Sequence, residues 1–184
     1  MDFLGLRTLT VIQDTIDLVK QNQGIDVKFD EKMNDPKVYK LWQNGESVGI
    51  FQFESQGMTN FMKELKPDCL EDIIAGVSLY RPGPMDQIPR YIANKKDPEH
   101  AVYTHPALKP ILEVTYGCMV YQEQVMQIVR DLAGYSLGRA DLVRRAMGKK
   151  KLDVMAKERE IFIHGQTDEN GNIVVPGCIR NGID

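Results

Sequence analysis

The chain has 184 residues, the length of one domain or of one large part of a longer protein. With 42% hydrophobic and 27% charged residues it can form a sizeable core, which excludes a disordered tail. The net charge of −3 does not indicate nucleic-acid binding, although a local basic patch can still bind phosphate. No run of about 18 apolar residues is present, which excludes a transmembrane helix.

The N-terminus and the cysteines indicate the cellular compartment. Residues 1–5 lack the basic and apolar regions of a secretory signal. The three cysteines, Cys69, Cys118 and Cys178, are odd in number, far apart, and not close to the histidines in a ligand spacing. This usage argues against a structural zinc site and against a disulfide scaffold, so we predict a cytoplasmic protein.

The first half of the chain predicts short helices with clear boundaries. Residues 2–6 have the pattern of a strand, and apolar residues at helical spacing follow (Leu9, Ile12, Ile16 and Val19). Asp35-Pro36 predicts the start of a second helix and Gly45 its end. Ser55 is a predicted N-cap for a third helix, and residues 48–53 before it are the best internal strand candidate.

The middle of the chain continues this helical pattern. Asp68 and Glu71 resemble a capping box that starts a fourth helix. This helix must end before the turn at residues 81–84, which has the sequence Arg-Pro-Gly-Pro, because two prolines and a glycine prevent its continuation. Short helices are predicted around residues 88–92 and 106–112.

In the second half, apolar residues recur at helical spacing in three segments: 121–132, 142–147 and 152–162. Gly134 and Gly148 are the expected ends of the first two. Asn170-Gly171, followed by an apolar run, predicts a small β-hairpin. The fold class is therefore mainly α, a multi-helical domain with a short N-terminal strand and a small hairpin.

Positive charge is concentrated in one segment of this acidic chain. Six cations lie there against Asp141 alone: Arg139, Arg144, Arg145, Lys149, Lys150 and Lys151. On a helix, Leu142, Val143, Ala146 and Met147 would face the core, with Arg144 and Arg145 on the opposite arc. Two interpretations remain open: a solvated basic surface that complements a helix C-terminus, or a phosphate-binding site. A new helix starting after Gly148 would add backbone N–H groups to such a site.

Asp2 is unremarkable by itself, because a single carboxylate at the end of a strand is more often a cap or a surface residue. Two-metal phosphoryl chemistry needs several carboxylates that converge from different strands. The chain supplies only one at a strand-like position.

Several long motifs occur in one order along the chain. They are DFLGLRTL at residues 2–9, GIFQFES at 49–55, LYRPGPM at 79–85, TYG at 115–117, YQEQVM at 121–126, ADL at 140–142 and RRAMGKKK at 144–151. With these motifs the chain closely resembles the C family of bacterial replicative DNA polymerases, the alpha subunits of DNA polymerase III. The resemblance covers nearly the whole chain.

The resemblance implies that the chain is a fragment, with the end of the palm in residues 1–20 (strand plus helix) and the fingers in residues 21–184. Asp2 takes the place of a catalytic carboxylate that binds metal, and its two partners are expected upstream. Arg144 and Arg145 match paired arginines that bind the triphosphate of the incoming nucleotide, and Lys149, Lys150 and Lys151 match the lysines that follow. Arg81 in the proline-rich turn is a candidate for positioning DNA or nucleotide.

The resemblance also implies the reaction and its partners. A primer 3′-hydroxyl attacks the α-phosphorus of a deoxynucleoside triphosphate at a Mg²⁺ site, and pyrophosphate leaves. The cations of the fingers neutralise the β- and γ-phosphates and the leaving pyrophosphate. The implied partners are primer-template DNA, dNTP, the rest of the alpha subunit and other replicase subunits, with no membrane. The isolated fragment is expected to be inactive.

Two other functions are compatible with the basic helix. One is a non-catalytic helical module that binds nucleic acid or nucleotide, and the other is a helical protein-interaction module whose cations are only surface. The DFLGL strand distinguishes them from a polymerase fragment. An unpaired apolar edge strand suits a chain whose pairing strands lie elsewhere, and it is a liability in an independent module.

Overall fold

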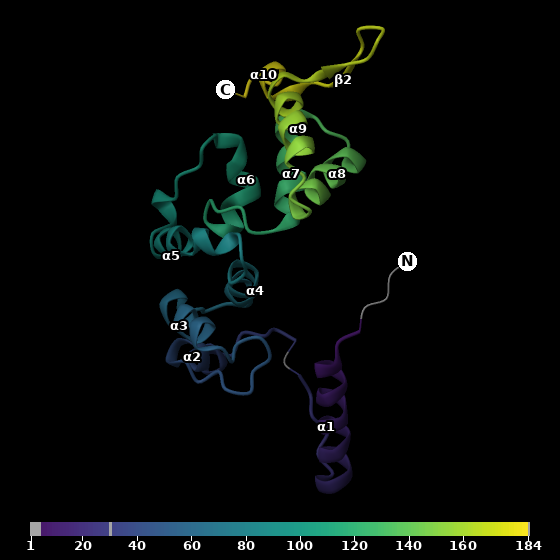
Figure 1. Cartoon of the computed structure of the whole chain (residues 1–184). Helices are drawn as coiled ribbons and strands as arrows, with labels where there is room; N and C mark the ends of the chain where they lie inside the picture. Colours follow the sequence, from purple (N-terminus) through teal and green to yellow (C-terminus); the bar gives the residue numbers. More distant parts are fainter. Residues whose placement is uncertain (1–4, 30, 184) are drawn as a thin grey trace. The chain divides into compact units, whose positions relative to one another are not determined.

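The computed structural model describes residues 5–29 and 31–183, and it confirms a mainly α fold with one small hairpin (Figure 1). The structure divides into two compact units, one up to Gly76 and one from Val77. Residues 1–4 of the predicted N-terminal strand lie outside the described residues, and Gly5 and Leu6 have no regular secondary structure. No helix in the described ranges has both the length and the apolar character needed to cross a bilayer.

The first helix of the chain, α1 (Arg7–Gln23), forms where the apolar spacing predicts it. It ends at Gly24, whose φ of 68° is in the left-handed region and whose amide donates to the Lys20 carbonyl. None of its residues is buried, and Leu9 is 63% exposed. Its apolar residues therefore contribute no core within the part of the chain that the structure describes.

The other helices of the first unit have the predicted caps. The Asp35 carboxylate accepts from the Lys37 amide at 2.8 Å to start α2 (Pro36–Asn44). The Ser55 hydroxyl accepts from the Met58 amide at 3.3 Å to start α3 (Gln56–Leu65). Apolar side chains of α2, α3 and the segment between them form the core of this unit: Tyr39, Phe53, Met58, Phe61, Met62 and Leu65.

The predicted strand over residues 48–53 is wrong, because this segment forms two successive turns. The Ile50 amide donates to the Ser47 carbonyl at 3.1 Å, and the Phe53 amide donates to the Ile50 carbonyl at 3.0 Å. Gly49 and Gln52 have φ values of 80° and 69°, which a strand does not allow. The buried Ser47 hydroxyl closes the segment by donating to the Phe53 carbonyl at 2.8 Å.

Helix α4 (Leu70–Leu79) starts with a variant of the predicted cap. The Asp68 amide donates a hydrogen bond to the carboxylate of the buried Asp72 at 3.0 Å. Glu71 is the acceptor that the sequence predicts for this cap. As predicted, α4 ends before the Arg-Pro-Gly-Pro turn. The rest of this half consists of short helices: η1 (Pro84–Gln87), α5 (Ile88–Lys96), η2 (Pro98–His100), η3 (Pro106–Leu108), α6 (Lys109–Leu112) and η4 (Glu113–Thr115).

The second unit is built around three longer helices, α7 (Gln122–Ala133), α8 (Leu137–Gly148) and α9 (Leu152–His164). Figure 1 shows them side by side, with α10 (Gly177–Arg180) and the hairpin at one end. The hairpin pairs β1 (Gln166–Thr167) with β2 (Ile173–Val175) in antiparallel orientation, as Asn170-Gly171 predicts. The core that joins these elements includes Ile111, Leu112, Val129, Leu132, Tyr135, Val143, Ile161 and Val175.

A partly buried ion pair connects α8 to α9. Arg139 on α8 donates from Nε and Nη2 to the Glu158 carboxylate on α9, at 3.3 and 3.2 Å. The two side chains are 21% and 18% exposed. The Tyr135 hydroxyl donates to the same carboxylate at 2.9 Å, and the Arg139 guanidinium lies 5.1 Å from the centre of the Tyr135 ring. The charges are therefore compensated where α8 meets α9.

A buried carboxamide fixes the entrance to α7. Gln124 Oε1 accepts from the amides of Val120 and Tyr121 at 2.8 and 2.9 Å. Its Nε2 donates to the Thr115 hydroxyl at 2.8 Å and to the Ile111 carbonyl at 3.3 Å. Gln124 is 4% exposed, so the amides of Val120 and Tyr121 depend on a buried side chain for their hydrogen bonds.

Replacing Gln124 by leucine is expected to destabilise the second unit by about 1–3 kcal/mol, because buried backbone groups lose their partners. Amide hydrogen exchange of α6 and α7 measures the effect. Gln127→Leu is the matched control, since Gln127 is an exposed glutamine on the same helix. The unfolding of the first unit, followed by fluorescence of the single Trp42, should not change. Equal protection in the Gln124 and Gln127 variants would contradict this role.

Stability is expected to fall above about pH 10, in part through Tyr135. Burial raises the pKa of its phenol, and the hydrogen bond to Glu158 raises that pKa further. The folded chain keeps the phenol protonated where the unfolded chain ionises it, so this contribution is complete below about pH 10 and is lost above it. Urea unfolding followed by circular dichroism at pH 8 and pH 10.5 tests this. Tyr135→Phe should be less stable at pH 8 but should lose less on going to pH 10.5, and equal losses would refute the assignment.

Candidate nucleotide-binding site

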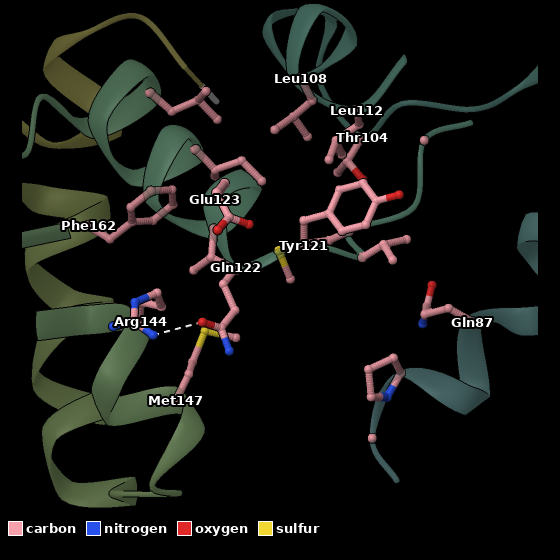
Figure 2. Close-up of a pocket in the computed structure, with 18 of the residues that line it drawn as sticks. Gln87, Thr104, Leu108, Leu112, Tyr121, Gln122, Glu123, Arg144, Met147 and Phe162 are labelled. Atoms are coloured by element: carbon pink, nitrogen blue, oxygen red, sulfur yellow. Dashed lines mark hydrogen bonds between the residues drawn. The ribbon is translucent and has the colours of Figure 1, made fainter. Parts of the chain in front are cut away.

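A cleft of about 1450 Å³ lies entirely within the second unit. Residues of α7, α8 and α9 form one wall, and the η1 segment and residues 103–112 form the other (Figure 2). Much of the lining is apolar and includes Leu108, Leu112, Ile128, Met147 and Phe162. A largely apolar cleft with a few polar groups at defined places is the usual form of a small-molecule site.

Four cations line this cleft: Arg81, Arg90, Arg144 and Lys150. Three of them are predicted phosphate ligands, and the fold brings Arg81 together with the basic helix although about sixty residues of sequence separate them. Arg90 is not among the predicted ligands. It lies in the first turn of α5, and its Nη2 donates to the Val102 carbonyl at 2.9 Å. Its spacing relative to other cations gives no signal, and only the fold reveals its place.

The other predicted site residues are not in the lining of the cleft. Arg145, Lys149 and Lys151 are exposed beside it. Asp2, the predicted catalytic residue and metal ligand, lies outside the described residues. The six cations of the basic segment thus divide into three groups. Arg144 and Lys150 line the cleft, Arg145, Lys149 and Lys151 are exposed beside it, and Arg139 is paired with Glu158 between α8 and α9.

Arg144 is held on two sides. Its Nε and Nη2 donate to Asp141 Oδ1 at 2.9 and 2.7 Å, and its Nη1 donates to Gln122 Oε1 on α7 at 2.7 Å (Figure 2). Arg145 Nε donates to the other Asp141 oxygen at 2.7 Å. The hydrogen bonds from Arg144 have the largest effect in lowering the pKa of the Asp141 carboxyl below its usual value, and Arg145 lowers it further. One carboxylate thus serves two guanidiniums, and the group keeps a net positive charge.

The predicted faces of α8 are only half correct. Val143 and Ala146 are buried as expected, but Leu142 is 63% and Met147 is 40% exposed. The buried stripe instead runs through Ala140, Val143 and Ala146, because these side chains pack at the contact of α8 with α7 and α9. Met147 lines the cleft, which explains its exposure. Arg145 is 61% exposed, whereas Arg144 is only 28% exposed and is more enclosed than the helical arc suggests.

A new helix does begin after Gly148, as anticipated. The amides of Lys149 and Lys150 donate back to the carbonyls of Arg145 and Met147, each at 3.0 Å, and close the end of α8. Lys150 has a φ of 51°, which turns the chain sharply between α8 and α9. The turn directs one of the three lysines to the cleft and leaves the others in solvent.

The entrance of α7 contributes polar groups to the cleft. Gln122 and Glu123 of the YQEQVM motif are both exposed in the lining. The buried member of this motif is Gln124. Figure 2 shows Gln122 beside Arg144, with Gln87 on the opposite wall.

The described residues do not form a site for Mg²⁺. Among them, one group of three candidate ligands lies close together: Asp68, Cys69 and Asp72. The Asp72 carboxylate accepts a hydrogen bond from the Asp68 amide. Burial raises the pKa of the Cys69 thiol to about 11, so the thiol stays protonated at neutral pH. Mg²⁺ prefers six oxygen ligands in octahedral geometry, whereas this group offers two carboxylates, one of them already bonded to an amide, beside a protonated thiol.

Known proteins resemble this chain over most of its length. Residues 8–170 match the family model of the bacterial DNA polymerase III alpha subunit finger domain. DNA polymerase III subunit alpha of Thermus aquaticus is 53% identical over 171 residues, which are 90% of this chain and 14% of that protein. The same subunit of Rickettsia felis is 53% identical over 170 residues, 92% of this chain and 14% of that protein.

The same subunit of Staphylococcus aureus strain MRSA252 is 48% identical over 172 residues, which are 93% of this chain and 16% of that protein. The chain therefore spans only about one seventh of the length of these relatives. The family model covers far more than half of the chain, and the relatives share about half of its residues. The chain belongs to the finger-domain family of the bacterial DNA polymerase III alpha subunit.

Proposed function

We propose that this chain acts as the fingers region of a replicative DNA polymerase and binds the triphosphate of the incoming dNTP in the cleft of the second unit. The observation that carries the proposal is that Arg81 lines the same cleft as Arg144 and Lys150 of the distant basic segment. Arginine stays charged at any working pH and can bond two phosphate oxygens at once, which suits it to a triphosphate.

The cleft also offers a surface for the rest of the nucleotide. Apolar side chains continue from the cations along the same lining, including Leu108, Leu112 and Phe162. A base or sugar can rest against such a surface while the phosphates bind the cations. Arg145, Lys149 and Lys151 lie outside the cleft, and we propose that they contact phosphates that extend from it or the DNA backbone.

The nucleotidyl transfer itself is part of the proposal, with primer-template DNA and dNTP as substrates. Mg²⁺ would supply the metal chemistry, and Asp2 is the proposed ligand from this chain. The described residues supply no further ligand for a Mg²⁺ ion held by Asp2, so the other carboxylate ligands would come from the rest of an alpha subunit. Contacts with other replicase subunits would also come from there. The role of the described residues is to bind and orient the triphosphate.

Arg144→Ala is expected to weaken the binding of dATP and of inorganic tripolyphosphate to this chain about tenfold, because one charge-assisted contact is lost. Isothermal titration calorimetry at low and moderate salt measures both ligands, and the affinity should fall as salt rises. Arg130→Ala is the matched control, since it removes one exposed arginine of α7 that is outside the cleft lining. Equal affinities of the Arg144 and Arg130 variants would refute the proposed site.

This chain alone is expected not to extend a primer, even with Mg²⁺ and all four dNTPs, because one carboxylate does not fix two metal ions about 3.5–4 Å apart. A gel assay with purified chain and a labelled primer-template measures this. Extension that disappears in the Asp2→Asn variant would overturn the expectation. In a complete alpha subunit that carries this segment, Asp2→Asn should nearly abolish turnover with the fold intact, and normal turnover would remove Asp2 as a metal ligand.

A further inference from the structure

The hydrogen bond between Gln122 and Arg144 joins two helices, α7 and α8, that form one wall of the cleft. Gln122 is the first residue of α7, and its Oε1 accepts from Arg144 Nη1 on α8 at 2.7 Å. The two residues are 22 positions apart in the chain, so the bond is a product of the fold. Gln122 itself starts from a fixed backbone, because the Tyr121 amide before it donates to the buried Gln124 carboxamide.

The bonds of Arg144 leave part of its guanidinium available. Of its five N–H groups, Asp141 takes one at Nε and one at Nη2, and Gln122 takes one at Nη1. One N–H on each terminal nitrogen remains without a partner in the described residues. Two terminal nitrogens with one free N–H each are suited to two oxygens of a phosphate.

Asp141 alone does not fix where these N–H groups point relative to the cleft. It lies three residues before Arg144 on the same helix, so it restrains the guanidinium only against α8. Gln122 comes from α7 and restrains the opposite edge. A carboxamide also leaves the arginine charge intact, whereas a second carboxylate would cancel the charge that Asp141 has not already balanced.

We propose that Gln122 is a positioning residue that holds the Arg144 guanidinium so that its free N–H groups face the polyphosphate of a bound nucleotide. This inference rests on the proposed function of the cleft. The Gln122 amide nitrogen has no partner in the described part of the chain and supplies a further donor at the same place. The main effect of Gln122 on the phosphate is nevertheless expected through Arg144, because the hydrogen bond between the two side chains is already formed without a ligand.

The test measures tripolyphosphate binding to the 184-residue chain by isothermal titration calorimetry. Gln122→Ala should weaken binding about three- to tenfold, the range expected for one hydrogen bond. Gln122→Glu should weaken it more, because the added negative charge opposes the ligand. Gln127→Ala, an exposed glutamine of the same helix outside the cleft lining, should bind as the unchanged chain does. Thermal unfolding should be the same for all variants, since Gln122 is exposed.

A double-mutant cycle separates positioning from a direct contact. In the Arg144→Ala background, Gln122→Ala should have little further effect, because the residue then has nothing to position. Full additivity of the two losses, or unchanged binding by Gln122→Ala alone, would overturn the inference. If Arg144→Ala itself leaves binding unchanged, the proposed function of the cleft fails. If Arg144→Ala weakens binding but Gln122→Ala does not, only the role of Gln122 fails.

Discussion

The buried carboxamide of Gln124 is the constraint on which the cleft depends. It closes the chain between α6 and α7 with four hydrogen bonds, two accepted from consecutive amides and two donated to Ile111 and Thr115. A buried polar group of this kind is stable only when its partners are in place, so it selects one conformation of the turn. That conformation sets where Tyr121, Gln122 and the start of α7 meet the cleft.

The other two helices of the same wall, α8 and α9, are held together by charge. The Arg139–Glu158 pair connects α8 to α9, and Tyr135 shares its carboxylate. Both side chains are mostly enclosed, so each charge needs the other, and the pair favours one arrangement of the two helices. Arg139 belongs by sequence to the basic segment, yet its neighbours make it a structural residue. Position along the chain therefore does not separate the cations that hold the fold from those that remain available for a ligand.

Local signals in the sequence are sufficient for most of the helices. Asp35 and Ser55 form the predicted caps, and Gly134 ends α7 with a φ of 76°, because these are interactions between residues four or fewer positions apart. Residues 48–53 mislead because their apolar side chains suit a strand, whereas Gly49 and Gln52 adopt turn conformations set by the buried Ser47. The outward positions of Leu142 and Met147, and the place of Arg90, depend on packing between distant segments, which periodicity does not encode.

In the basic site, Asp141 holds two arginines in place, and the group still keeps a net positive charge. Asp141 binds both Arg144 and Arg145, so two positive charges are offset by one negative charge. The paired arginines are thereby ordered before any ligand arrives, which reduces the entropy lost when a phosphate binds. An uncharged acceptor, Gln122, then orders Arg144 further without cancelling its charge. If the cleft binds a nucleotide as proposed, a ligand with a single weak negative charge would compete poorly with Asp141 for these guanidiniums. A triphosphate would have Arg81 and Lys150 of the same lining as further partners, so the arrangement would favour anions that carry several charges.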